Sequence, residues 1–162
     1  MMRRATIFAF LMSGLTALPV AAQTVAFGGM KADTSAPVEL AADNLTVNQS
    51  NGQAEFTGNV RIGQGQMKLS ADKVVVQYVQ GDTKKIDNLE ATGNVTLVNG
   101  ADAAEAQQAT YEVSSGNITL IGDVLLTQGE NVMSGDKILV NLADGTAQAS
   151  GRVRSVLQPG SN

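Results

Sequence analysis

Carboxylate side chains recur in this sequence at spacings that could support chemistry. Asp43, Asp72, Asp123 and Asp136 each fall once per repeat of the chain, which raises the question of a ladder of calcium sites. Calcium-binding β-repeats are much shorter and place Gly and Asp densely, whereas here Gln107 takes one of the acidic positions. We therefore interpret these aspartates as residues that bond nearby backbone at a bulge or turn.

Glutamates offer a second chemistry, the hydrolysis of a glycosidic bond by a pair of carboxylates. Glu55, Glu90 and Glu112 each alternate with apolar neighbours, as expected for solvent-facing strand residues, and they form no cluster in the sequence. The chain has no His and no Cys, which excludes Ser-His-Asp and Cys-His nucleophiles and the common zinc sites. We therefore assign no catalytic residue, no metal and no cofactor, and we expect that the protein is not an enzyme.

The first residues have the pattern of an export signal. Arg3 and Arg4 precede an apolar run over residues 5–18, and small side chains lead up to Ala22, so we expect a signal peptide over residues 1–22. Retention of this segment as an anchor is the alternative. Removing it lowers the net charge from −4 to −6, because it contains two basic residues and no acidic one. Such an acidic chain has no electrostatic reason to bind nucleic acid.

Two short motifs alternate along the rest of the chain and define a repeat. Gly followed by Asn, Asp or Arg and then Val recurs at intervals of 35, 29 and 29 residues, and an Asp or Gln follows each of the first three glycines by 14 residues. Fixed spacing of this kind indicates a repeat architecture. We expect four two-strand units of about 29 residues, one of them lengthened near Gly81. The glycines are Gly58, Gly93, Gly122 and Gly151.

Each unit reads as two strands joined by turns. Asn51-Gly52 and Asp144-Gly145 are strong hairpin signals, and Gln64-Gly65, Asn99-Gly100 and Gln128-Gly129 mark the turns at the opposite end of the units. Between the turns, Val, Ile, Leu and Thr alternate with polar residues, and no convincing helical periodicity is present. We expect eight strands, over residues 38–48, 53–63, 66–79, 86–98, 104–114, 117–127, 132–142 and 146–156.

In the strands that contain the repeat Gly, the apolar residues stay an even number of positions apart on both sides of the Gly, as from Phe56 to Val60. In the other strands the spacing becomes odd near the middle, as from Leu69 to Val74. A residue inserted at Ala-Asp, a β-bulge, would return the apolar side chains to one face and bend the strand. The Gly opposite would permit the same bend. The sequence therefore predicts an all-β fold, a twisted antiparallel β-jellyroll forming an open two-sheet trough.

The aliphatic side chains that face the inside of this trough are the candidates for function. Any one of them is more simply explained as ordinary core. As a set they are poor in aromatics and interspersed with Ala, which leaves space that an acyl chain could fill at about 0.8 kcal/mol per buried CH₂. The candidate lipid-binding groove comprises Leu45, Val47, Phe56, Val60, Ile62, Met67, Leu69, Val74, Val76, Leu89, Val95, Leu97, Tyr111, Ile118, Leu120, Val124, Leu126, Ile138 and Val140.

The two ends of the repeat array carry no polar cap of the kind that soluble repeat proteins need. Unpaired edge strands pair readily with other chains, and pairing of the first edge with the last could build a filament. We expect flexible segments over residues 23–37 and 158–162 on either side of the folded domain, residues 38–157. The expected edge-strand interface is Val38, Leu40, Val153, Val156 and Leu157.

Two functions remain open at this point. In one, lipid slides through the apolar groove with its polar part in water, and the motive force comes from elsewhere because the chain has no phosphate-binding loop. In the other, the protein is an exported structural β-repeat protein that assembles edge to edge around a closed, dry core.

At the repeat motifs the sequence resembles the LptA/OstA family of periplasmic lipopolysaccharide-transport proteins. The matching stretch is EFTGNVRIGQGQMKLSADKVVVQY at residues 55–78, with weaker matches at residues 91–97 and 134–140. The resemblance implies an OstA-like jellyroll whose groove holds the lipid A acyl chains of lipopolysaccharide. It also implies edge-to-edge docking with inner-membrane-anchored and outer-membrane transport components, and head-to-tail self-association. The chain is shorter in its middle turns and lacks the basic C-terminal tail of better-known relatives.

Overall fold

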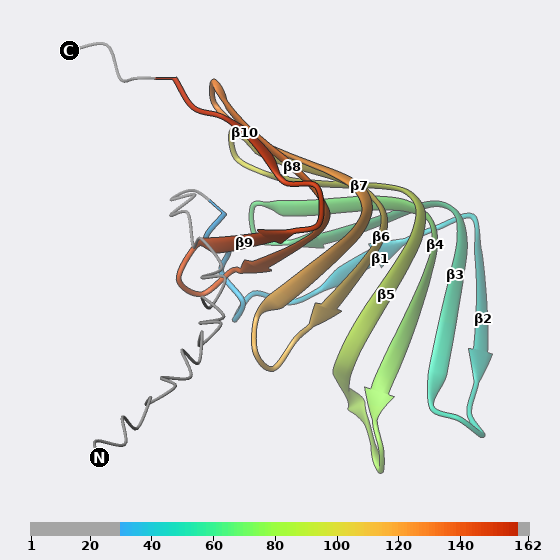
Figure 1. The fold of residues 1–162 in the computed structure, drawn as a ribbon. Helices are drawn as coiled ribbons and strands as arrows, with labels where there is room; N and C mark the ends of the chain where they lie inside the picture. The colour runs from blue at the N-terminus through green and yellow to red at the C-terminus, as the bar shows by residue number, and fades with distance from the viewer. Residues whose placement is uncertain (1–29, 159–162) are drawn as a thin grey trace, which may run out of the picture.

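The computed structural model describes residues 30–158, and within them the chain folds entirely into strands and turns (Figure 1). No helix of this part of the chain is long and apolar enough to cross a membrane. The expected signal peptide, residues 23–29 and most of the expected tail lie outside the described residues. The strands are β1 (Glu39–Ala41), β2 (Asn44–Asn48), β3 (Gln53–Gln64), β4 (Met67–Val79), β5 (Asp82–Asn99), β6 (Asp102–Glu112), β7 (Asn117–Gln128), β8 (Asn131–Asn141), β9 (Thr146–Ser150) and β10 (Arg154–Val156).

The strands form one antiparallel sheet in which each of the long strands pairs with the long strand next to it in the sequence. Strands β3 to β8 follow one another across the sheet, because each pair is joined by a short turn. Strands β1 and β2 both pair with β3, along its second and first halves respectively. Strands β9 and β10 pair in the same way with β8. The expected all-β trough is confirmed.

Ten strands replace the eight expected because the two outermost strands are interrupted. The segment 38–48 divides at Asp43 into β1 and β2, and the segment 146–156 divides at Gly151 into β9 and β10. The inner strands pass through the same bend as continuous elements, since each is hydrogen-bonded on both sides. The outermost strands have a partner on one side only.

The bend itself lies where the sequence predicted it, but the extra residue lies on the other strand. Between β3 and β4, the two residues Gly58 and Asn59 of β3 oppose the single residue Asp72 of β4. Both bulge residues of β3 have positive φ, 80° for Gly58 and 47° for Asn59. The same arrangement recurs at each later glycine of the series. The sequence predicts the inserted residue at Ala-Asp, which is instead the shorter side of the bulge.

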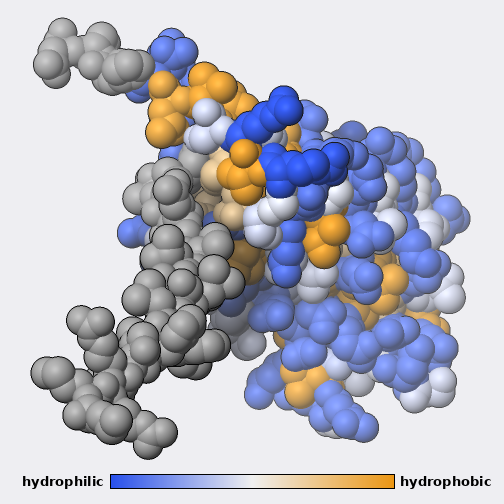
Figure 2. All heavy atoms as spheres, in the orientation of Figure 1, coloured by the Kyte–Doolittle hydropathy of each residue, from blue (hydrophilic) through white to orange (hydrophobic). Residues whose placement is uncertain are grey.

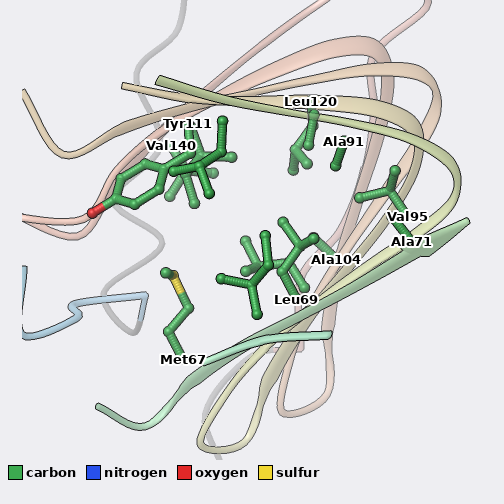
Figure 3. Close-up of a cluster of buried hydrophobic side chains, with 14 of the residues drawn as sticks. Met67, Leu69, Ala71, Ala91, Val95, Ala104, Tyr111, Leu120 and Val140 are labelled. Atoms are coloured by element: carbon green, nitrogen blue, oxygen red, sulfur yellow. The ribbon is translucent and has the colours of Figure 1, made fainter. Parts of the chain in front are cut away.

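The bend divides the sheet into two facing walls. The first wall contains β1, β10 and residues 60–64, 67–70, 95–99, 102–106, 124–128 and 131–135. The second wall contains β2, β9 and the other halves of the long strands. Figure 3 shows side chains of the first wall (Met67, Leu69 and Ala104) opposite Tyr111, Leu120 and Val140 of the second. The space between the walls is the core of the molecule.

Candidate functional site

The predicted groove residues meet between the two walls. Sixteen of the nineteen are buried and pack into one continuous apolar cluster. Alanines on the inner face, including Ala54, Ala91, Ala104 and Ala109, are also buried, so the walls lie close together. The buried members of the predicted groove are Val60, Ile62, Met67, Leu69, Val74, Val76, Leu89, Val95, Leu97, Tyr111, Ile118, Leu120, Val124, Leu126, Ile138 and Val140.

The remaining three predicted groove residues lie at the first edge of the sheet. Leu45 and Val47 of β2 are 56% and 59% exposed, although they are paired with Phe56 and Ala54 and therefore share the inner face with them. Phe56 is half-buried against the core. No strand of the described chain covers β2, so the apolar interior reaches solvent at this edge.

The predicted interface residues divide between the two edges. Val38 and Leu40 are half-buried against the core at the first edge. Val153, Val156 and Leu157 are exposed at the last edge, and Figure 2 shows apolar side chains gathered in the region where Figure 1 places β10. Together with the exposed Leu45 and Val47, these residues give both edges an apolar component.

A row of side-chain pairs runs along the bend, one pair per repeat. In the first two units an Asn amide donates to an aspartate: Asn59 Nδ2 lies 2.7 Å from Asp43 Oδ2, and Asn94 Nδ2 lies 2.8 Å from Asp72 Oδ2. The third pair is reversed, with Gln107 Nε2 donating to Asp123 Oδ2. In the fourth, the Arg152 guanidinium donates to Asp136 and holds the pKa of that carboxyl below its usual value. We call these four the corner pairs.

The corner pairs correct the expectation that the aspartates bond their own backbone, because they bridge neighbouring strands instead. No group of three or more potential metal ligands occurs among residues 30–158. The glutamates considered for glycoside chemistry lie on the outer face, where Glu55 forms an ion pair with Lys73 at 2.9 Å.

Opposite the bend, the turn ends of the two walls approach each other along a line that we call the seam. Here Tyr111 of the second wall donates its phenolic hydrogen to Gln64 Oε1 of the first, at 2.8 Å. Burial raises the pKa of the Tyr111 phenol. This hydrogen bond ties the two walls together across the interior.

Residues 30–36, which we call the strap, lie along the seam. Their backbone bonds to both walls: Ala32 N–H donates to Leu142 O at 3.2 Å, and Asn99 Nδ2 donates to Lys31 O at 2.7 Å. Met30 is 4% exposed and belongs to the core cluster. In Figure 1 the strap is the blue segment that precedes β1, beside β9. The described part of the segment that we expect to be flexible is thus hydrogen-bonded to both walls.

The outer face has hollows as well, and their linings combine apolar and charged residues. One of about 610 Å³ lies on the first wall near β1, lined by the apolar residues Leu40, Ile62 and Val98 together with Glu39, Arg61 and Lys68. Its rim contains charges of both signs. We therefore regard the interior between the walls, with its seam and its open edge, as the candidate site.

Comparison with known proteins places this architecture in a family. The family model described as "LptA/(LptD N-terminal domain) LPS transport protein" matches residues 39–146. The lipopolysaccharide export system protein LptA of Escherichia coli K12 is 33% identical over 136 residues, covering 78% of this chain and 74% of that protein. An uncharacterised protein of Rhizobium meliloti is 30% identical over 141 residues, covering 81% of this chain and 76% of the relative.

A solved structure agrees with the fold. The crystal structure of LptH, the LptA-homologous periplasmic component of the lipopolysaccharide transport device of Pseudomonas aeruginosa, superposes with a TM-score of 0.71 at 20% identity. The match covers 79% of this chain and 99% of that one. With the family model spanning most of the strands, the chain belongs to the LptA/LptD N-terminal domain family of lipopolysaccharide transport proteins.

Proposed function

We propose that this chain binds lipopolysaccharide in the periplasm and passes it towards the outer membrane. The observation that carries the proposal is the apolar interior between the two walls, which extends from repeat to repeat and reaches solvent at β2. Acyl chains seated there would gain about 0.8 kcal/mol per buried CH₂. The sugars and phosphates of the lipid would remain in water along the seam.

We assign the chain to the periplasm from its amino-terminal export pattern and from its LptA relatives. The proposed role is that of a conduit, in which no bond is made or broken in the lipid. A structural filament with a dry core is the weaker alternative, because the LptA relatives of this chain are lipopolysaccharide export proteins.

The proposed partners are other jellyrolls of the same kind, docked edge to edge. They comprise an inner-membrane-anchored component, an outer-membrane component and further copies of this chain. LptD of Actinobacillus pleuropneumoniae contains a stretch that is 33% identical to this chain over 91 residues and 12% of that protein, so such docking would join similar sheets. Charge also favours head-to-tail pairing: Glu39 is at the first edge, and Arg154 is at the last.

The proposal is tested by photo-crosslinking inside a Gram-negative cell. A benzophenone amino acid replaces Phe56, which faces the interior and is only half-buried, so the sheet should tolerate the larger ring. The matched control replaces Val75, which faces outwards from the neighbouring strand. We expect lipopolysaccharide to crosslink at position 56 and not at position 75. Crosslinking at neither position, with the protein folded in the periplasm, would contradict the proposal.

A further inference from the structure

Three side-chain amides occupy equivalent positions along the seam. Gln64, Asn99 and Gln128 are each the last residue of a strand in the first wall and each precede a turn glycine. They are 35 and 29 residues apart, the spacing of the repeat itself. Gln64 is 1% exposed and Asn99 is 6% exposed, so both amides are buried although they stand at the ends of strands.

Two of these amides hold backbone carbonyl groups of the strap. Gln64 Nε2 donates to Thr34 O at 3.1 Å and to Ala36 O at 2.9 Å. Asn99 Nδ2 donates to Lys31 O. In the third unit, Gln128 lies 3.5 Å from Asp102 and lines a small space with Met30. The first wall therefore presents the amide donors of Gln64 and Asn99 to the strap, and we call these two the donor row.

The strap and a lipid would compete for this row. The space around Met30, Leu126 and Val140 leaves no room for a water molecule, so acyl chains cannot enter there while the strap is in place. The strap belongs to no strand pair, so its departure would leave the sheet intact. Its departure would also remove the acceptors of Gln64 and Asn99, and an incoming molecule that covers these donors without supplying oxygen atoms would leave them unpaired, which costs free energy.

We propose that the seam is a binding site for the carbonyl oxygens through which acyl chains are attached to an amphiphile, and that the strap occupies this site until such a molecule displaces it. The inference rests on the proposed function, which it extends to a recognition element. Ester and amide carbonyls would take the positions of the Lys31, Thr34 and Ala36 oxygens. A hydrocarbon without carbonyl groups would leave the donor row unsatisfied and would displace the strap poorly.

A disulfide that locks the strap tests the competition. The chain has no natural Cys, and a Cβ built on Gly65 lies 3.7 Å from the Cβ of Asp33, a separation suited to a disulfide. We expect the reduced Asp33→Cys/Gly65→Cys variant to bind fluorescent hexa-acylated lipid A, and the oxidised form to bind it at least about tenfold more weakly. The backbone strain of a Cys at position 65, where φ is +58°, is present in both the reduced and the oxidised forms, so the comparison between them controls for it.

A second disulfide controls for rigidity alone. Thr110 and Thr119 are directly opposed on the outer face, away from the strap, and a Thr110→Cys/Thr119→Cys pair should bind lipid A equally when oxidised and reduced. Equal binding by the oxidised and reduced strap variant would overturn the inference and leave the proposed function standing. Absence of binding by the unsubstituted chain would overturn the proposed function itself.

The role of the carbonyl oxygens is tested with two matched amphiphiles, monodecanoylglycerol and the decyl ether of glycerol, below their critical micelle concentrations. The readout is maleimide labelling of a Met30→Cys variant, whose thiol should be protected while the strap is seated. We expect the ester to accelerate labelling at least about fivefold more than the ether. Equal acceleration by both would show that the donor row plays no part in recognition.

Discussion

At the scale of single residues, the hydrogen bond between Tyr111 and Gln64 is the contact whose loss is most easily measured. Replacing Tyr111 with Phe keeps the ring and removes the donor, which leaves the buried Gln64 Oε1 without its partner. We expect a loss of about 1–3 kcal/mol in the free energy of unfolding at neutral pH. Urea denaturation followed by circular dichroism measures it.

The burial of the Tyr111 phenol gives the stability of the fold a pH dependence of definite sign. The folded-state pKa of Tyr111 is raised above 10.0, so the folded chain holds the phenolic proton more tightly than the unfolded chain does. The stabilisation is therefore fully present below about pH 10 and is lost as the pH rises through the folded-state pKa. The unsubstituted chain should lose stability faster than Tyr111→Phe above pH 10, and parallel pH profiles would contradict this assignment.

The glycines of the bend offer a second measurement at this scale. Gly93 has φ +80°, and a Cβ there would lie 2.5 Å from Asp72 Oδ2, the acceptor of the corner pair with Asn94. We expect Gly93→Ala to cost about 1–3 kcal/mol through backbone strain and loss of that pair. Gly63 of β3 is the control, because its φ is not positive and a Cβ built there would have no atom within 4 Å. Gly63→Ala should therefore change the free energy of unfolding by less than about 0.5 kcal/mol. Thermal or urea unfolding of both variants compares them directly.

At the scale of elements, the corner pairs show how the repeat tolerates change. The third unit has its amide and carboxylate exchanged relative to the first two, with Gln107 as donor and Asp123 as acceptor. Gln107→Asp alone would place two carboxylates opposite each other and should cost about 0.5–1 kcal/mol. Adding Asp123→Asn restores one donor and one acceptor and should recover most of that loss. A double-mutant cycle measured by denaturation would show no coupling if the pair contributes nothing.

Much of this element structure could be predicted from the sequence, for a physical reason. Alternation with period two, turn glycines and a fixed repeat all act locally, so they determine the strands and the bend without knowledge of tertiary contacts. The alternation could not show which of the two paired strands carries the extra residue of the bulge. An insertion on either strand would be compatible with the same pattern of apolar residues. The positive φ of Asn59, Asn94 and Asp123 decides it.

The strap was missed for a different reason. Residues 30–36 have no periodicity of their own, and their order depends on partners far along the chain, such as Asn99 and Leu142. The one signal in the sequence was the amide before each turn glycine, at Gln64, Asn99 and Gln128, which we interpreted only as part of the turns. Likewise, alternation assigned Leu45 and Val47 correctly to the inner face, but it could not show that no wall lies opposite them.

At the scale of the whole molecule, the two open edges of the sheet should determine assembly. Glu39 of β1 and Arg154 of β10 both lie on the outer face of the first wall, at opposite edges, so head-to-tail pairing would bring them to the same side of a continuous sheet. We expect Arg154→Glu and Glu39→Lys each to weaken self-association, measured by sedimentation at low salt. An equimolar mixture of the two variants should associate, because each edge then meets the opposite charge. Association unaffected by either change would exclude this edge pairing.

The order of the strands has a consequence for how the chain reaches its final structure. From β3 to β8 every strand pair joins neighbours in the sequence, so this part of the sheet can grow hairpin by hairpin with short loop closures. The strap, by contrast, bonds to Asn99, 68 residues away, and to Leu142, which follows β8. The described residues that are synthesised first are therefore the last to find their place. For the interval before they do so, the newly made protein has a complete sheet with its seam uncovered.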